Sequence, residues 1–178
     1  MIRKLNVDEL IGVLQELDRE LAEPIVIRAV GGFALAWRNV REEGLTADID
    51  TITDDYPAAV EQAIGRIGAK HGLDPWWLNN DAAADDAEYL IDSMDLRWEL
   101  VECGFSHISL YVADLESLLK LKLSAVEDST LSGRVRDLDD TVHLLKALGL
   151  SKEAFRERYA YLQDDMPNAY RLVSHAIW

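Results

Sequence analysis

Apolar residues recur at helical spacing near the start of the chain. The leucines of this stretch lie three or four residues apart, at Leu10, Leu14, Leu17 and Leu21. Asn6 and Glu9 have the spacing of a capping box, and Pro24 ends the run. The pattern predicts a first amphipathic helix between Asn6 and Pro24.

Two short segments rich in β-branched residues follow. Residues 25–30 predict a buried strand that ends at Gly31-Gly32, and a helix is expected from 33 to about 42. Residues 46–53 predict a second strand, and a helix is expected over 58–71. Residues 76–81, in the middle of the chain, are interpreted as a packed loop or the start of a short helix.

The second half changes from strands to helices. Residues 96–103 and 107–112 predict an antiparallel hairpin joined at Gly104, Phe105 and Ser106. Helical spacing then marks four segments, at 114–127, 134–148, 151–163 and 168–177. We expect an α+β fold with two regions, a mixed-sheet core with flanking helices over 1–113 and a C-terminal helical region over 114–178 that packs on the core.

Chain length and net charge indicate an acidic protein of about one domain. The 178 residues are enough for one domain with a substantial core, and 18 Lys and Arg against 33 Asp and Glu give a net charge of -15. This charge opposes nonspecific attraction to nucleic acid over most of the surface. The basic residues of the C-terminal third are interleaved with acidic ones, which is typical of a solvated mixed-charge surface.

Cysteine content and hydropathy suggest a compartment. Cys103 is the only cysteine, which excludes an intrachain disulfide framework and Cys-based zinc clusters. Acidic residues come too early in the chain for a signal peptide, and the longest uncharged apolar run, residues 29–37, is too short to cross a bilayer. We expect a cytoplasmic protein with no membrane association.

Two glycines and two aspartates carry the candidate chemistry. On a strand, Asp48 and Asp50 point to the same face and can share a cation, while Ile49 points into the core. Mg²⁺ prefers oxygen ligands, commonly one or two carboxylates with substrate phosphates. Gly31 and Gly32 join a strand to a helix, where bare backbone allows close approach of a phosphate. The alternatives are a tight turn without ligand and a chance spacing, since Asp137-Leu138-Asp139 has the same spacing.

The order of these motifs resembles a known family. Residues 30–35, Val-Gly-Gly-Phe-Ala-Leu, followed by residues 45–50, Leu-Thr-Ala-Asp-Ile-Asp, look like the signature of the nucleotidyltransferase superfamily. Residues 118–123, Leu-Leu-Lys-Leu-Lys-Leu, followed by 136–140, Arg-Asp-Leu-Asp-Asp, look like its AbiEii/AbiGii toxin-like branch. Residues 77–79, Trp-Leu-Asn, also resemble a segment of related members with no assigned role. The resemblance covers roughly residues 25–148 and implies a nucleotidyltransferase-like fold.

The resemblance also implies a reaction and a set of site residues. Asp48 and Asp50 would be catalytic and bind Mg²⁺, and Gly31 and Gly32 would hold the phosphates of a nucleoside triphosphate. An acceptor hydroxyl, on an RNA end or a protein, would attack the α-phosphorus and release pyrophosphate. Matching positions add Lys122 and Asp137 to the catalytic set, and Lys122 and Arg136 to the nucleotide-binding set. A toxin role would add an antitoxin protein as partner.

Several assignments have alternatives. Lys122 is either the branch's lysine or a lysine that extends from a core-facing helix to solvent. Arg136 either pairs with Asp140 on the helix surface or is oriented, like Lys122, by Asp137 and Asp140 toward phosphates. A third carboxylate is usual in the superfamily, and its candidates are Glu99, Glu102 and Asp95.

A second class of function stays open. The branch often has a basic residue directly before its first aspartate, where this chain has Ala47. The alternative to an enzyme is a catalytically degenerate binding module that sequesters a protein or nucleotide partner. Phosphotransfer or hydrolysis on the same scaffold is a third possibility.

Overall fold

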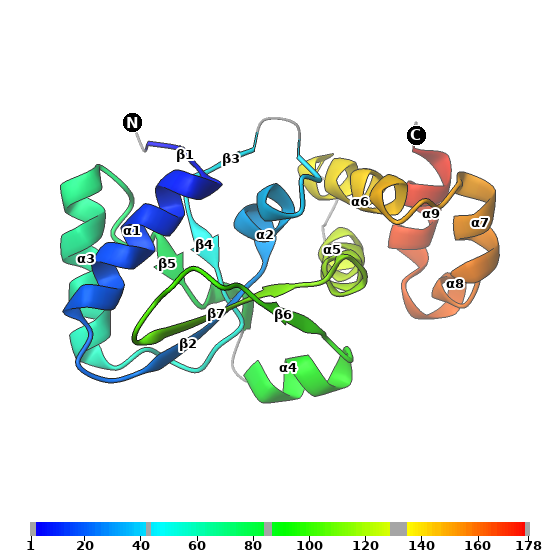
Figure 1. Cartoon of the computed structure of the whole chain (residues 1–178). Helices are drawn as coiled ribbons and strands as arrows, with labels where there is room; N and C mark the ends of the chain where they lie inside the picture. Colours follow the sequence, from blue (N-terminus) through cyan, green and yellow to red (C-terminus); the bar gives the residue numbers. More distant parts are fainter. Residues whose placement is uncertain (1–2, 42–43, 84–86, 129–134, 177–178) are drawn as a thin grey trace. The chain divides into compact units, whose positions relative to one another are not determined.

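The computed structural model describes residues 3–41, 44–83, 87–128 and 135–176 (Figure 1). The chain divides into two compact units, unit 1 from Met1 to Asp114 and unit 2 from Leu115 to Trp178. Unit 1 contains the strands described below, and the elements described in unit 2 are helices.

The first helix forms where the leucine spacing predicts it. Helix α1 spans Val7–Glu20, and its first turn is closed by the predicted capping box. The Glu9 backbone N–H donates to the Asn6 side chain at 2.9 Å, and the Asn6 N–H donates to the Glu9 carboxylate at 3.0 Å. Leu10, Leu14 and Leu17 are buried. Helix α3 spans Ala58–His71, as predicted, and lies beside α1 (Figure 1).

A mixed sheet forms the centre of unit 1. Strand β2 (Ile25–Ala29) runs parallel to β7 (Ile108–Ala113), and β6 (Trp98–Leu100) is antiparallel to β7, which confirms the predicted hairpin. An antiparallel bridge between Ala29 and Thr51 continues the sheet from β2 to β4 (Ile49–Asp50), which is parallel to β5 (Leu78–Asn79). Strand β1 (Leu5–Asn6) pairs with β3 (Leu45–Thr46). The remaining short elements are the 3₁₀ turn η1 (Asp81–Ala83) and α4 (Ala87–Ser93).

The structure corrects three sequence predictions in unit 1. The strand expected over 46–53 is two short strands, β3 and β4, separated at Ala47 and Asp48, so Asp48 lies before β4 rather than within a strand. The segment 76–81, expected as loop or helix, contains β5, which is fixed by hydrogen bonds from Ile49 N to Trp77 O and from Thr51 N to Asn79 O. Helix α2 (Gly31–Trp37) ends before 42 because the backbone becomes left-handed at Asn39, with φ 56°.

Asp18 of α1 connects this helix to the start of β7 by hydrogen bonds. Its carboxylate accepts the backbone N–H groups of Ser106, His107 and Ile108 at 2.7–3.1 Å. Asp18 is buried, and burial opposes its ionisation, but these three donors outweigh burial and lower the pKa of Asp18 below its usual value. The carboxylate therefore satisfies the backbone donors of the two residues before β7 and of the first residue of this strand.

Unit 2 consists, in its described part, of the helices α5 (Leu115–Asp128), α6 (Val135–Ala147), α7 (Lys152–Arg158), α8 (Leu162–Asp165) and α9 (Pro167–His175). The single helix expected over 151–163 is divided, because α7 ends at Arg158 and α8 starts at Leu162. Apolar side chains from α5, α6, α7 and α9 are buried, among them Leu119, Leu144, Phe155 and Val173.

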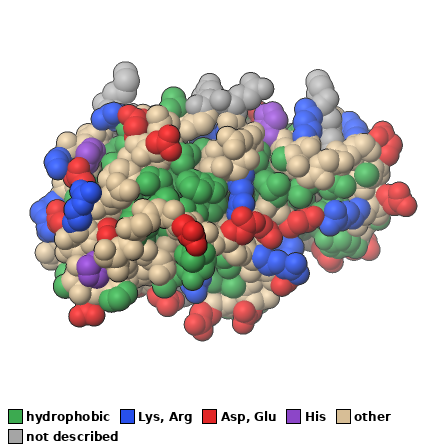
Figure 2. Space-filling view, viewed as in Figure 1, with side chains coloured by type: hydrophobic (Ala, Val, Ile, Leu, Met, Phe, Trp, Pro, Cys, Tyr) green, Lys and Arg blue, Asp and Glu red, His purple; other side chains and the backbone are tan. Residues whose placement is uncertain are grey.

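The protein therefore has an α+β fold with a mixed sheet and flanking helices, as predicted. None of the helices in the described ranges is both long enough and apolar enough to cross a bilayer. On the face shown in Figure 2, Lys and Arg side chains lie among Asp and Glu side chains instead of forming one basic patch.

Candidate functional site

The Gly31-Gly32 turn lies where β2 meets α2. Gly31 has a left-handed backbone, with φ 59°, a conformation that glycine adopts without steric cost. The Val30 N–H donates to the Asp50 carbonyl at 2.8 Å, so the end of β2 is held against the end of β4. The two motifs that are distant in sequence are thus joined by the backbone.

Asp50 lies directly against Gly31. A Cβ atom added to Gly31 would collide with Oδ2 of Asp50 and would lie 3.0 Å from its Cγ. The carboxylate therefore fills the space that a side chain at position 31 would need. Glycine is required here by both the backbone conformation and the neighbour.

The second glycine brings Asp48 to the same turn. A Cβ atom added to Gly32 would lie 2.6 Å from Oγ1 of Thr46 and 2.8 Å from Nη1 of Arg41. The Thr46 hydroxyl donates to Oδ1 of Asp48 at 3.1 Å. Asp50 thus reaches the turn at Gly31, and Asp48 reaches it through Thr46 at Gly32, although Asp48 is outside the strand.

Asn79 of β5 stands beside Asp50. The two residues are register partners in the parallel β4–β5 pair, and Nδ2 of Asn79 lies 3.4 Å from Oδ1 of Asp50. Nδ2 also donates to the Trp76 carbonyl at 3.2 Å, and Oδ1 of Asn79 accepts the Asp81 N–H at 3.0 Å. Only 9% of Asn79 is exposed.

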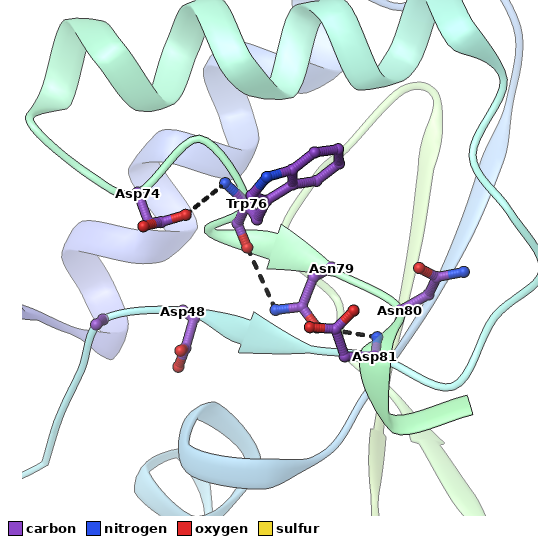
Figure 3. Close-up of a pocket in the computed structure, with 7 residues that line it drawn as sticks. Asp48, Asp74, Trp76, Asn79, Asn80 and Asp81 are labelled. Carbon is purple, nitrogen blue, oxygen red and sulfur yellow. Dashed lines mark hydrogen bonds between the residues drawn. The ribbon is translucent and has the colours of Figure 1, made fainter. Parts of the chain in front are cut away.

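An acidic pocket of about 470 Å³ opens next to these strands (Figure 3). Besides Ala47, it is lined by Asp48, Asp74, Trp76, Asn79, Asn80 and Asp81. Figure 3 shows the Asp48 side chain pointing away from Trp76. Because three carboxylates and no basic residue are among these lining residues, the pocket disfavours phosphate groups.

Lys122 and Asp137 meet within unit 2. Nζ of Lys122 on α5 lies 2.6 Å from Oδ1 of Asp137 and 3.0 Å from Oδ2 of Asp140, both on α6. The exposed fractions of the three side chains are 14%, 13% and 5%. The shared helix face of Asp137 and Asp140 therefore orients Lys122, whereas Arg136 is exposed.

The three candidates for a further carboxylate have other surroundings. Glu99 forms an ion pair with Arg38 at 2.6 Å, and Asp95 forms one with Arg97 at 3.2 Å. Glu99, Glu102 and Asp95 are all exposed. Within the described ranges, no group of three or more His, Cys, Asp or Glu side chains is arranged to hold a metal ion.

Sequence reasoning did not single out Thr46, Arg41 or Asn79 for the site. Arg41 and Thr46 reach the turn only through the chain path between α2 and β4. The resemblance of residues 77–79 to a segment of related family members included Asn79. The sequence did not show that β5 pairs with β4, so no role could be assigned to this residue.

Comparison of the chain with protein-family models, with curated proteins and with solved structures finds no match.

Proposed function

We propose that the chain is a magnesium-dependent nucleotidyltransferase that transfers a nucleoside monophosphate from a nucleoside triphosphate to an RNA end or a protein hydroxyl. The observation that supports this most is that Asp50 and Arg41 lie against the Gly31-Gly32 turn, with Asp48 hydrogen-bonded to Thr46, which also lies against Gly32. The bare backbone of the turn lets the Asp50 carboxylate and the Arg41 guanidinium come close to it, and a guanidinium attracts phosphates.

The residues at the turn fit a magnesium ion. The carboxylate of Asp50 lies in a space that a Cβ atom would fill, and that of Asp48 is held by Thr46. Two carboxylates together with substrate phosphates form a common ligand set for Mg²⁺. When bound, the ion would neutralise charge on the phosphates and activate the attacking oxygen.

The reaction requires positioning more than covalent chemistry. The acceptor hydroxyl gives its proton to solvent and its oxygen forms a bond to the α-phosphorus, while the bond from that phosphorus to the bridging oxygen breaks and pyrophosphate leaves with the electron pair. Asp48 and Asp50 would hold the ion that binds the triphosphate, and Arg41 would contribute positive charge at Gly32. The proposed roles of Lys122, Arg136 and Asp137 in catalysis and nucleotide binding rest on the family resemblance alone.

The test combines binding and transfer. The full chain is incubated with Mg²⁺ and each of the four α-³²P ribonucleoside triphosphates, together with total RNA and total protein. We expect label in one acceptor class and release of pyrophosphate, and loss of both in Asp48→Ala and Asp50→Ala. Asp54→Ala is the matched control, since Asp54 is an exposed aspartate close behind β4. Labelling that persists in both site variants would rule the proposal out.

The binding-module alternative is favoured by one observation. The Lys122 ammonium is held by two carboxylates, so its positive charge is already compensated and attracts a phosphate less. A partner captured equally by the wild type and the Asp48→Ala, Asp50→Ala double variant, with no pyrophosphate released, would favour this alternative.

A toxin role within a toxin–antitoxin pair would be supported if expression arrests growth and a co-expressed antitoxin protein relieves the arrest.

A further inference from the structure

We infer that Asn79 is a positioning residue that orients the Asp50 carboxylate for metal binding. The inference rests on the proposed function of Asp50 and assigns a role to a residue on the neighbouring strand. Its basis is the register of β4 and β5, which places the two side chains next to each other.

The Asn79 backbone is fixed on the β4 side. Its carbonyl accepts the Thr51 N–H at 2.9 Å and the Thr51 hydroxyl at 2.7 Å. Two residues earlier in each segment, the Ile49 N–H donates to the Trp77 carbonyl. The Cα of Asn79 therefore has little freedom to move along β4.

The orientation of the amide is determined by its partners. The Asp81 N–H can only donate, so it requires the oxygen of the Asn79 amide, and the Trp76 carbonyl can only accept, so it requires the NH₂ group. With both satisfied, the NH₂ group also faces Oδ1 of Asp50. The amide thus presents a donor, and not an acceptor, to the carboxylate.

The two carboxylate oxygens of Asp50 have different neighbours. Oδ1 lies toward Asn79, while Oδ2 lies against Gly31. Hydrogen bonds to a ligating carboxylate fix its orientation, and loss of such a partner commonly lowers metal affinity by about 10–100-fold. At 3.4 Å the contact is long, so we expect the lower end, about tenfold.

The chain contains a matched control at the next position. The Asn80 amide donates to Asp55 at 2.8 Å, so Asn80→Ala removes the same chemical group from the same segment without touching Asp50. Asn79→Leu is the second test variant, because it keeps about the same size and removes the NH₂ donors without adding a carboxylate that could itself bind the ion. This variant decides the matter if Asn79→Ala does not fold.

The experiment measures Mn²⁺ affinity of the full chain by electron paramagnetic resonance, with the metal alone and with each of the four ribonucleoside triphosphates. We expect about tenfold weaker Mn²⁺ binding in Asn79→Ala and Asn79→Leu, and less than twofold change in Asn80→Ala. Nucleotide affinity in EDTA should stay within twofold, since a merely structural defect would lower both affinities.

The outcomes separate this inference from the proposed function. If Asp50→Ala binds Mn²⁺ and nucleotide like the wild type, the proposed function fails. If Asp50→Ala loses Mn²⁺ while a folded Asn79→Ala keeps it, only the role of Asn79 is overturned. Unchanged or tighter Mn²⁺ binding in a folded Asn79→Leu would overturn it as well, because the NH₂ donor of Asn79 would then have no effect on the metal site.

Discussion

Lys122 and Asp137 form a nearly buried ion pair between α5 and α6, with 2.6 Å between Nζ and Oδ1. Asp140, one turn further along α6, accepts the same ammonium at 3.0 Å. The two helices are thus joined by a charged cluster as well as by apolar packing.

The first prediction concerns the stability of this cluster. Lys122→Met removes the ammonium from two carboxylates that are at most 13% exposed, and we expect a loss of about 3 kcal/mol in the free energy of unfolding. Urea unfolding followed by circular dichroism measures the loss. Lys146→Met, at an exposed position of α6, should change stability by less than about 0.5 kcal/mol. Equal effects of the two substitutions would contradict a stabilising role of the cluster.

The second prediction concerns pH and Asp18. The folded pKa of Asp18 is lowered from its ordinary value of 3.8, so its stabilisation is present above that value and is lost as pH falls through the folded pKa. Asp18→Asn should cost about 2 kcal/mol at pH 7, because three N–H donors lose a charged acceptor.

The measurement for Asp18 is the pH dependence of urea unfolding. Below pH 4 the wild type should lose stability more steeply than Asp18→Asn, so the two curves converge. Asp8→Asn, at an exposed position of the first turn of α1, is the control and should keep the wild-type slope. Parallel curves for the wild type and Asp18→Asn would be inconsistent with a depressed pKa.

The third prediction concerns the glycine turn. Gly31→Ala introduces a side chain at a left-handed position and pushes it against Asp50, so we expect a loss of at least about 1 kcal/mol in stability. Displacement of Asp50 should also weaken Mn²⁺ binding. Gly12→Ala is the matched control, because it adds a methyl group in open space within α1 and should raise stability by up to about 1 kcal/mol. The same sign for both substitutions would refute the steric argument.

The fourth prediction concerns Tyr159 in unit 2. Burial raises the pKa of Tyr159 to about 12, and the nearby Glu116 carboxylate, which accepts its hydroxyl at 3.1 Å, adds to the effect. Its contribution to stability is therefore complete below pH 10 and declines between pH 10 and 12. Titration of ¹³Cζ-labelled tyrosine by NMR, assigned with Tyr159→Phe, should show a lower pKa in Glu116→Gln that stays above 10.0. A pKa unchanged by Glu116→Gln would exclude the carboxylate as a cause.

Local chemistry determined much of this fold from the sequence alone. The capping box of Asn6 and Glu9 and the leucine spacing of α1 are signals carried by neighbouring residues, and α1 and α3 form where predicted. The hairpin of β6 and β7 has an equally local origin in its turn residues. Elements with short-range causes are thus the predictable part.

Tertiary pairing decided the rest. Strands β4 and β5 contain two residues each, too few for a periodic pattern, and they exist because each supplies the other's hydrogen-bond partners. Likewise, the sequence offered Gly31, Gly32, Asp48 and Asp50 as separate motifs. Only the folded chain brings Asp50 against Gly31, Arg41 beside Gly32 and Asn79 beside Asp50, because these contacts depend on the path of the backbone between segments distant in sequence.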